Sequence, residues 1–235
     1  MNRMKKGNDM KIKVHELFQS VSGEVGKIAQ GAITTFLRLD GCNLRCSWCD
    51  TKNTRKGDHH RNLDLGSVAA MIRELGSPNL IITGGEPLLQ WESLVSLIRD
   101  YLRRSVRLIQ VETNGSIILP GDLLPWVGSW VVDYKLRSSG QTEQMLPIRK
   151  FVDIPRDSWV KFVVASPEDL VQLRVVLNRI RQHVGPCYQL KYAFTPTGEI
   201  TANRLMKWMI KERVLDGILN VQIHKVAGIS EPGVR

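Results

Sequence analysis

Residues 32–51 read AITTFLRLDGCNLRCSWCDT, an apolar and β-branched run that changes into a polar loop with three cysteines. The first half predicts a β-strand, because β-branched and aromatic side chains suit a pleated, half-buried surface. The second half places Cys42, Cys46 and Cys49 in one loop, which can present three thiolates to one group. Iron in iron–sulfur clusters prefers thiolate ligands. We therefore interpret the stretch as a strand that ends at a metal centre.

Similar strand-like runs recur along the chain and alternate with longer segments of helical spacing. The runs NLIIT, RLIQVE, SWVVDY, WVKFVV, QLKYAF and NVQIH predict strands at 79–83, 107–112, 129–134, 159–164, 189–194 and 220–224. The segments 65–75, 91–104, 168–184 and 203–215 have the apolar spacing of helices, and Ser166 is placed to cap the third. This alternation indicates an α/β fold with a parallel sheet, either open or closed into a barrel.

Polar segments follow these strands directly. GGEP, TNG, KLRSSG, FTPTGE and HK each come just after a predicted strand, as the cysteine loop does. A barrel gathers the carboxyl ends of all its strands around one mouth, whereas an open doubly wound sheet has its crevice at a single switch point. The placement of the polar segments therefore favours a TIM-type barrel.

The size of the chain suits one domain. We expect a single domain over residues 11–235, preceded by a disordered leader at 1–10, where MNRMKKGNDM lacks apolar periodicity. No run approaches the roughly 20 apolar residues that span a bilayer, and no apolar segment follows the polar start to act as a secretion signal. We therefore expect a soluble, cytoplasmic protein with no membrane contact.

The net charge and the cysteine content raise the question of whether the protein binds nucleic acid. The net charge of +10 suits an acidic partner, but the basic residues are scattered and no RNA-binding aromatic motif accompanies them. We expect no direct contact with nucleic acid, and a zinc-bearing nucleic-acid binding protein is the alternative. Closed zinc sites use four ligands, and Cys187 could supply the fourth or be a small buried residue.

The cysteine spacing, with the aromatic Trp48 before the last cysteine, resembles the radical S-adenosylmethionine (SAM) superfamily. The glycine-rich IITGGEPLLQ, VETNG and VVDYK resemble further motifs of that superfamily. The resemblance implies an incomplete, modified TIM-type (β/α) barrel with a 4Fe-4S cluster on the three cysteines and SAM on its open iron. It implies SAM contacts from Trp48, Cys49, Asp50, Gly84, Gly85, Glu86, Asn114, Asp133, Tyr134 and Lys135. Taken singly, the glycine pair could be an ordinary turn and Trp48 a core aromatic.

Within the superfamily, ELFQSVSGEVGKIAQGAITTFLRLDGCN at 16–43 is similar to the start of 7-carboxy-7-deazaguanine synthases. The resemblance implies a pterin substrate held by Ser20, Val21, Ser22, Gly23, Glu24, Arg38, Thr83 and His224, with Thr51 as a Mg²⁺ ligand. Arg38 suits a carboxylate, because its planar fork can pair two oxygens. Simpler alternatives are a solvated Arg38, a Thr51 that caps a turn and a packed His224. The loop containing His59 and His60 is expected to be solvated.

The chain departs from the synthase pattern in places. Val25 stands where glycine is common, Ser22 where glutamine is frequent, and DYKLRSSG differs from the Ser-Pro-Lys form. These departures put single substrate contacts in question more than the reaction.

The resemblance implies a carbon–nitrogen lyase of deazapurine and queuosine biosynthesis. A 5′-deoxyadenosyl radical takes hydrogen from C6 of 6-carboxy-5,6,7,8-tetrahydropterin, and the ring contracts to 7-carboxy-7-deazaguanine as ammonia leaves. No catalytic residue beyond the cluster and SAM is implied. A homodimer and an electron donor such as flavodoxin or ferredoxin are expected. The rival enzyme is a glycyl-radical-enzyme activase, which shares the cysteine spacing but lacks the Ser-Gly-Glu loop and the Asp-Thr pair.

Overall fold

The structure is a computed structural model that describes residues 10–57, 60–185 and 190–229. The described strands form one sheet in the order β3-β1-β2-β4-β5-β6-β7-β8-β9. Their bounds are β1 Lys11–Val21, β2 Ile33–Leu39, β3 Arg61–Asp64, β4 Asn79–Gly84, β5 Leu108–Thr113, β6 Ser129–Tyr134, β7 Trp159–Val164, β8 Lys191–Pro196 and β9 Gly217–Leu219. The helices are α1 Leu65–Leu75, α2 Trp91–Ser96, α3 Pro167–Val184, α4 Ala202–Lys211 and α5 Ile223–Val226.

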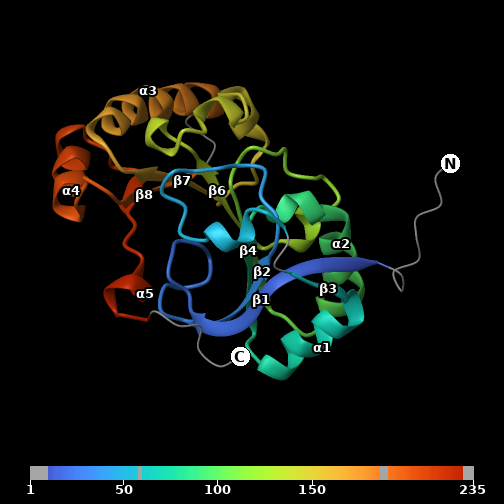
Figure 1. Ribbon diagram of the computed structural model, residues 1–235. Helices are drawn as coiled ribbons and strands as arrows, with labels where there is room; N and C mark the ends of the chain where they lie inside the picture. Colours follow the sequence, from blue (N-terminus) through green and yellow to red (C-terminus); the bar gives the residue numbers. More distant parts are fainter. Residues whose placement is uncertain (1–9, 58–59, 186–189, 230–235) are drawn as a thin grey trace.

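From β2 to β9, neighbouring strands run parallel. β1 is antiparallel to both β2 and β3, so it adds a hairpin to one edge of the parallel series. The sheet therefore ends at β3 and β9, and the α/β fold is a partial TIM-type barrel, as predicted. Helices α1 and α2 lie on one side of the view and α3 and α4 on the other, outside the sheet (Figure 1).

The central strands are apolar because both faces of the sheet are covered. β4 buries its first four residues, and β6 and β7 are buried along most of their length. Parallel strands covered on both faces have such continuous apolar runs. The buried side chains pack with α1, α2, α3 and α4 into one main core.

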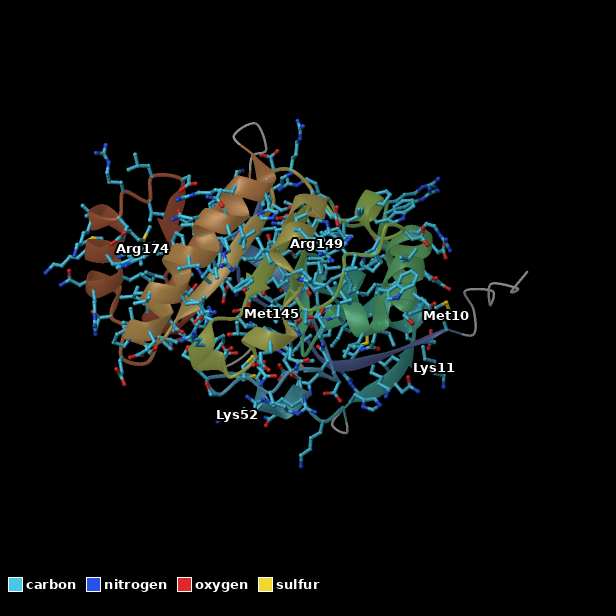
Figure 2. The ribbon with its side chains drawn as sticks, turned by 90° about the horizontal axis from the view of Figure 1, so that it is seen from above. Met10, Lys11, Lys52, Met145, Arg149 and Arg174 are labelled. Carbon is cyan, nitrogen blue, oxygen red and sulfur yellow. The ribbon has the colours of Figure 1, made fainter. Side chains whose placement is uncertain are left out.

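The helix ends follow local capping chemistry. The predicted cap of α3 is confirmed, since the Ser166 side chain accepts from the Asp169 amide and Asp169 reaches back to the Ser166 amide. Arg174, labelled in Figure 2, extends from α3 to Glu212 beyond α4, at 2.6 Å. The predicted helix over 91–104 is α2 followed by a π-helical turn at Leu97–Leu102.

The predicted strand at 220–224 is wrong. β9 ends at Leu219, and the Asn220 side chain donates to Thr195 Oγ1 of the neighbouring strand β8 at 2.8 Å. The chain then turns into α5, with the Ile223 amide donating to the Gly23 carbonyl. The alternation of apolar and polar residues suited a strand, but the Gln222 side chain donates to Glu24 in the loop after β1, and the chain leaves the sheet there.

Some expectations fall outside the described residues. These are residues 1–9 of the leader predicted over 1–10, together with Cys187 and His59. Met10, the last residue of that leader, is described and packs against the main core. His60 is described, and its Nδ1 lies 3.1 Å from the buried Asp40 carboxylate, so this residue is not solvated as expected. No helix in the described ranges is both long and apolar enough to cross a membrane.

Candidate active site

A cavity of about 700 Å³ opens at the carboxyl ends of the parallel strands. All six polar segments that follow predicted strands reach this region, and all but three of the predicted site residues line it. The predicted residues in its wall are Ser20, Val21, Gly23, Glu24, Arg38, Cys42, Cys46, Trp48, Cys49, Asp50, Thr51, Thr83, Gly84, Gly85, Asn114, Asp133, Lys135 and His224.

Three predicted residues lie outside this wall. Ser22 is fully buried, and its backbone closes the 22–32 loop through bonds with Gly31 and Ala32. Tyr134 packs its ring against Phe151 and Phe162 in the core. Glu86 is also fully buried, beneath the cavity. A direct contact of these side chains with SAM or substrate would need them to leave their present places.

The three cysteines all line the cavity, and the charges of Cys42 and Cys49 act on Cys46. Cys46 is buried and Cys42 and Cys49 are half-buried, and all are free. Burial raises the pKa of the Cys42 and Cys46 thiols, while the Lys135 ammonium acts in the opposite direction on Cys46. Metal binding removes such protons, because the ligand is the thiolate. Three thiols from one loop beside a cation suit a cluster held at three corners. Among the described residues, no three His, Cys, Asp or Glu side chains are grouped to hold a single metal ion.

The glycine pair supports the loop that carries the cysteines. A Cβ added to Gly84 would lie 2.2 Å from the Leu39 carbonyl oxygen, and one added to Gly85 would lie 2.0 Å from the Gly41 carbonyl oxygen. Gly84 also has φ of +131°, which side chains rarely tolerate. Glycine is needed at both positions because the backbone just before Cys42 lies against them.

Glu86 anchors the neighbouring TNG segment. Its carboxylate accepts from Thr113 Oγ1 at 2.8 Å and from the amides of Asn114 and Leu88 at 2.7 and 2.9 Å. Burial raises its pKa, and these hydrogen bonds act in the opposite direction. Asn114 in turn donates to Asn43 Oδ1 at 2.9 Å, beside Cys42. Glu86 thus fixes Asn114 against the cysteine loop.

Trp48 is held on the opposite side of that loop. Its indole nitrogen donates to Ser138 Oγ at 3.2 Å, and Lys135 Nζ lies 5.1 Å from the centre of its ring. A cation at that distance from an aromatic face is attracted to it. Trp48 therefore contacts the segment after β6 and is more than a core aromatic.

Arg38 occupies the substrate side, on β2. Its Nε lies 3.2 Å from Glu16 Oε2 on the paired strand β1, and its guanidinium carbon lies 5.6 Å from the centre of the Phe18 ring. These contacts hold the side chain in the cavity wall, so it is not simply solvated. Guanidinium groups held in this way suit a planar carboxylate.

A group of charged side chains forms the floor between the two sides. Lys161 pairs with Glu24 and lies 3.3 Å from Asp133, which also pairs with Lys135. Burial raises the pKa of Glu112 to about 7; the nearby Glu24 charge adds to this effect, and Lys161 opposes it. Thr83 donates to Glu112 at 3.2 Å.

The end of the described chain closes the substrate side. Gln222 donates to Glu24, and Lys225 lies 3.3 Å from Asp50 in the cysteine loop. His224 packs so closely on Gly23 that a Cβ there would lie 2.0 Å from its Nδ1. Burial lowers the pKa of His224, and the Lys225 charge adds to this effect.

Thr51 lies next to the cysteines, in the cavity wall. Its hydroxyl is 3.8 Å from Cys49 Sγ and makes no capping hydrogen bond to the turn that follows. Mg²⁺ accepts a single protein oxygen when water and substrate oxygens complete its shell. The position fits that use, although Asp50 beside it is already paired with Lys225.

Sequence reasoning missed several cavity residues, including Glu16, Glu112, Lys161 and Gln222. A lysine within the apolar run WVKFVV was the clearest available signal, because a buried strand accepts a charge only with partners. The partners come from other strands and loops, so the run alone did not identify them.

Comparisons with known proteins show what the chain is similar to. The radical SAM superfamily matches residues 37–124. A 7-carboxy-7-deazaguanine synthase of Clostridium acetobutylicum is 31% identical over 92% of this chain and 96% of its own length. One of Leptospira interrogans is 32% identical over 97% of this chain and 100% of its own. The crystal structure of QueE from Escherichia coli is 23% identical with a TM-score of 0.68, covering 88% of this chain and 93% of that one, and shows the shared fold.

Proposed function

Because the chain belongs to the 7-carboxy-7-deazaguanine synthase family of radical SAM enzymes, we propose that it converts 6-carboxy-5,6,7,8-tetrahydropterin into 7-carboxy-7-deazaguanine. The proposal rests on one cavity that is lined both by the three cysteines and by Arg38, which suits a carboxylate. Ammonia is the second product, so the enzyme is a carbon–nitrogen lyase. We place it in deazapurine synthesis, as in queuosine biosynthesis.

The residues at one side of the cavity bind the cluster and SAM. Cys42, Cys46 and Cys49 would hold the cluster, which would supply the electron for reductive cleavage of SAM. Trp48 and Asn114, on either side of the cysteine loop, position SAM.

On the other side, Arg38 pairs with the substrate carboxylate. Glu24 accepts a hydrogen bond from the pterin ring, and the Thr83 hydroxyl donates or accepts one. The cavity wall fixes the distance between the reacting groups.

We propose that Thr51 binds Mg²⁺ together with water and the substrate. Two observations support this use: the Thr51 hydroxyl lies beside Cys49, and it makes no capping hydrogen bond to the turn that follows. The ion would hold the substrate carboxylate on the cofactor side.

We further propose a homodimer in the cytoplasm that receives electrons from a flavodoxin or ferredoxin. Exposed apolar residues around α4 and β9, including Ile210, Leu215 and Ile218, support association. Free cysteines suit a reducing compartment. A single domain over 11–235 remains our proposal.

The test is an anaerobic reaction of the reconstituted protein with the pterin, SAM, Mg²⁺ and a reductant, followed by mass spectrometry. We expect 7-carboxy-7-deazaguanine, and a brown protein that loses its colour in Cys46→Ala but keeps it in Ser47→Ala. SAM cleavage without a deazapurine would favour the activase, and a colourless protein containing zinc would favour the nucleic-acid binding alternative.

A further inference from the structure

Lys161 lies at the point where the substrate and cofactor sides of the cavity meet. It is the third residue of β7, in a strand whose other residues are mainly buried and apolar. Its side chain is only 10% exposed. An apolar residue at such a place would avoid the cost of removing a charge from water, so the lysine needs a compensating role.

The ammonium of Lys161 contacts two carboxylates from different parts of the chain. One is Glu24, in the loop after β1 on the substrate side. The other is Asp133, 3.3 Å away near the end of β6, in the predicted SAM-binding motif. Burial alone would lower the pKa of Lys161, but Asp133, Glu24 and Glu112 together raise it well above the usual range. The ammonium is therefore kept charged between them.

Each of the two carboxylates has a second partner that extends the connection. Glu24 accepts from Gln222, just before α5. Asp133 pairs with Lys135, whose ammonium lies over the Trp48 ring in the cysteine loop. A continuous series of polar contacts therefore runs from the C-terminal segment through Lys161 to the cysteine loop.

We propose that Lys161 is a positioning residue that fixes the substrate-binding loop relative to the SAM-binding end of β6. This inference rests on the proposed function and adds to it a cavity residue that acts through Glu24 and Asp133. Hydrogen transfer from C6 needs the two reactants in contact, and small displacements lower such rates strongly. Loss of the ammonium would let Glu24 and Asp133 move apart. SAM and the pterin would then no longer be held at the distance that hydrogen transfer needs.

The test compares Lys161→Met and Lys161→Arg with a matched control, Lys191→Met. Lys191 lies on the neighbouring strand β8, pairs with Asp157 at 3.6 Å and has a side chain 44% exposed outside the cavity. Two quantities are measured. The first is the amount of 5′-deoxyadenosine released per 7-carboxy-7-deazaguanine formed. The second is amide hydrogen exchange at residues 22–26 and 222–225 in the ligand-free protein.

In Lys161→Met we expect the ratio of 5′-deoxyadenosine to product to rise at least about tenfold, because radicals form without a correctly placed substrate. Exchange at 22–26 and 222–225 should quicken by about tenfold as local opening becomes more frequent. Lys161→Arg should show a smaller rise in both, and Lys191→Met should match the wild type.

An unchanged ratio with unchanged exchange in Lys161→Met would overturn the proposal. So would a fall in product proportional to lost cluster with the ratio unchanged, which is what a merely structural role predicts. If Lys161→Met does not fold, Lys161→Arg decides, and a wild-type ratio there rejects the proposal. Wild-type protein that cleaves SAM but forms no deazapurine would reject the proposed function instead. The hydrogen-exchange comparison would still test whether Lys161 holds Glu24 close to Asp133.

Discussion

Glu112 shows how single side chains in the cavity depend on their neighbours. Its pKa is raised from 4.5 to about 7, first by burial and then by the Glu24 charge. Between these values the folded protein keeps a proton that the unfolded chain has lost. The free energy of unfolding therefore falls as the pH rises through this window, by up to about 1.4 kcal/mol per pH unit from this group.

Glu112→Gln should remove that part of the pH dependence, because glutamine keeps the shape and does not titrate. Urea unfolding at pH 5 and pH 7 should show a smaller loss of stability in the variant than in the wild type. Glu199→Gln, at an exposed position, is the control and should follow the wild type. Parallel curves for Glu112→Gln and the wild type would contradict a proton on Glu112.

Thr51→Ala should weaken the stimulation of product formation by Mg²⁺ while leaving the cluster in place. The hydroxyl is the proposed ligand, and the cysteines do not depend on it. The measurement is a Mg²⁺ titration of the rate beside iron and sulfide content. The same half-saturating Mg²⁺ concentration in both proteins would remove Thr51 as the ligand.

Among the elements, α3 supports the cavity through its first turn. Asp169 is fully buried and accepts from the amides of Ser138, Ala165 and Ser166 at 3.0, 2.8 and 3.3 Å. Ser138 in turn accepts from the Trp48 indole. The start of this helix therefore holds the segment that contacts the cysteine loop.

Asp169→Ala should lower the free energy of unfolding by about 3 kcal/mol, because several buried donors lose their acceptor. Glu168→Ala changes the exposed neighbour in the same turn and should lower the free energy of unfolding far less. Urea unfolding of both variants checks the difference. Equal losses would mean that only the general charge at the helix start matters.

The elements also show which features were accessible from sequence. β4, β6 and β7 were predicted because strands covered on both faces have continuous apolar runs. β1 was missed, since it is antiparallel and carries polar residues such as Glu16 and Ser20 toward the cavity. The cysteines and glycines were identified from local motifs. Lys161 and Glu112 were not, because their roles arise only when separate strands meet.

At the scale of the whole molecule, the net charge of +10 should assist an acidic electron carrier. Charge attraction accelerates association at low ionic strength and is screened by salt. We expect reduction of the cluster by flavodoxin or ferredoxin to slow by about tenfold or more between 20 mM and 500 mM salt. Stopped-flow absorbance measures the rate, and photoreduction by an uncharged deazaflavin is the control. Equal salt dependence for both reductants would argue against steering.

The two ends of the described chain supply part of the substrate side, through β1 with its following loop and through α5, and Arg38 on β2 and Thr83 on β4 complete it. The middle of the chain, from β2 to β6, supplies the cysteines and their supports. Mutations near residues 16–24 and 222–225 can thus alter which small molecule is accepted while the radical-generating centre stays intact. Such a division offers evolution, and protein engineers, a way to redirect one reactive species toward new substrates.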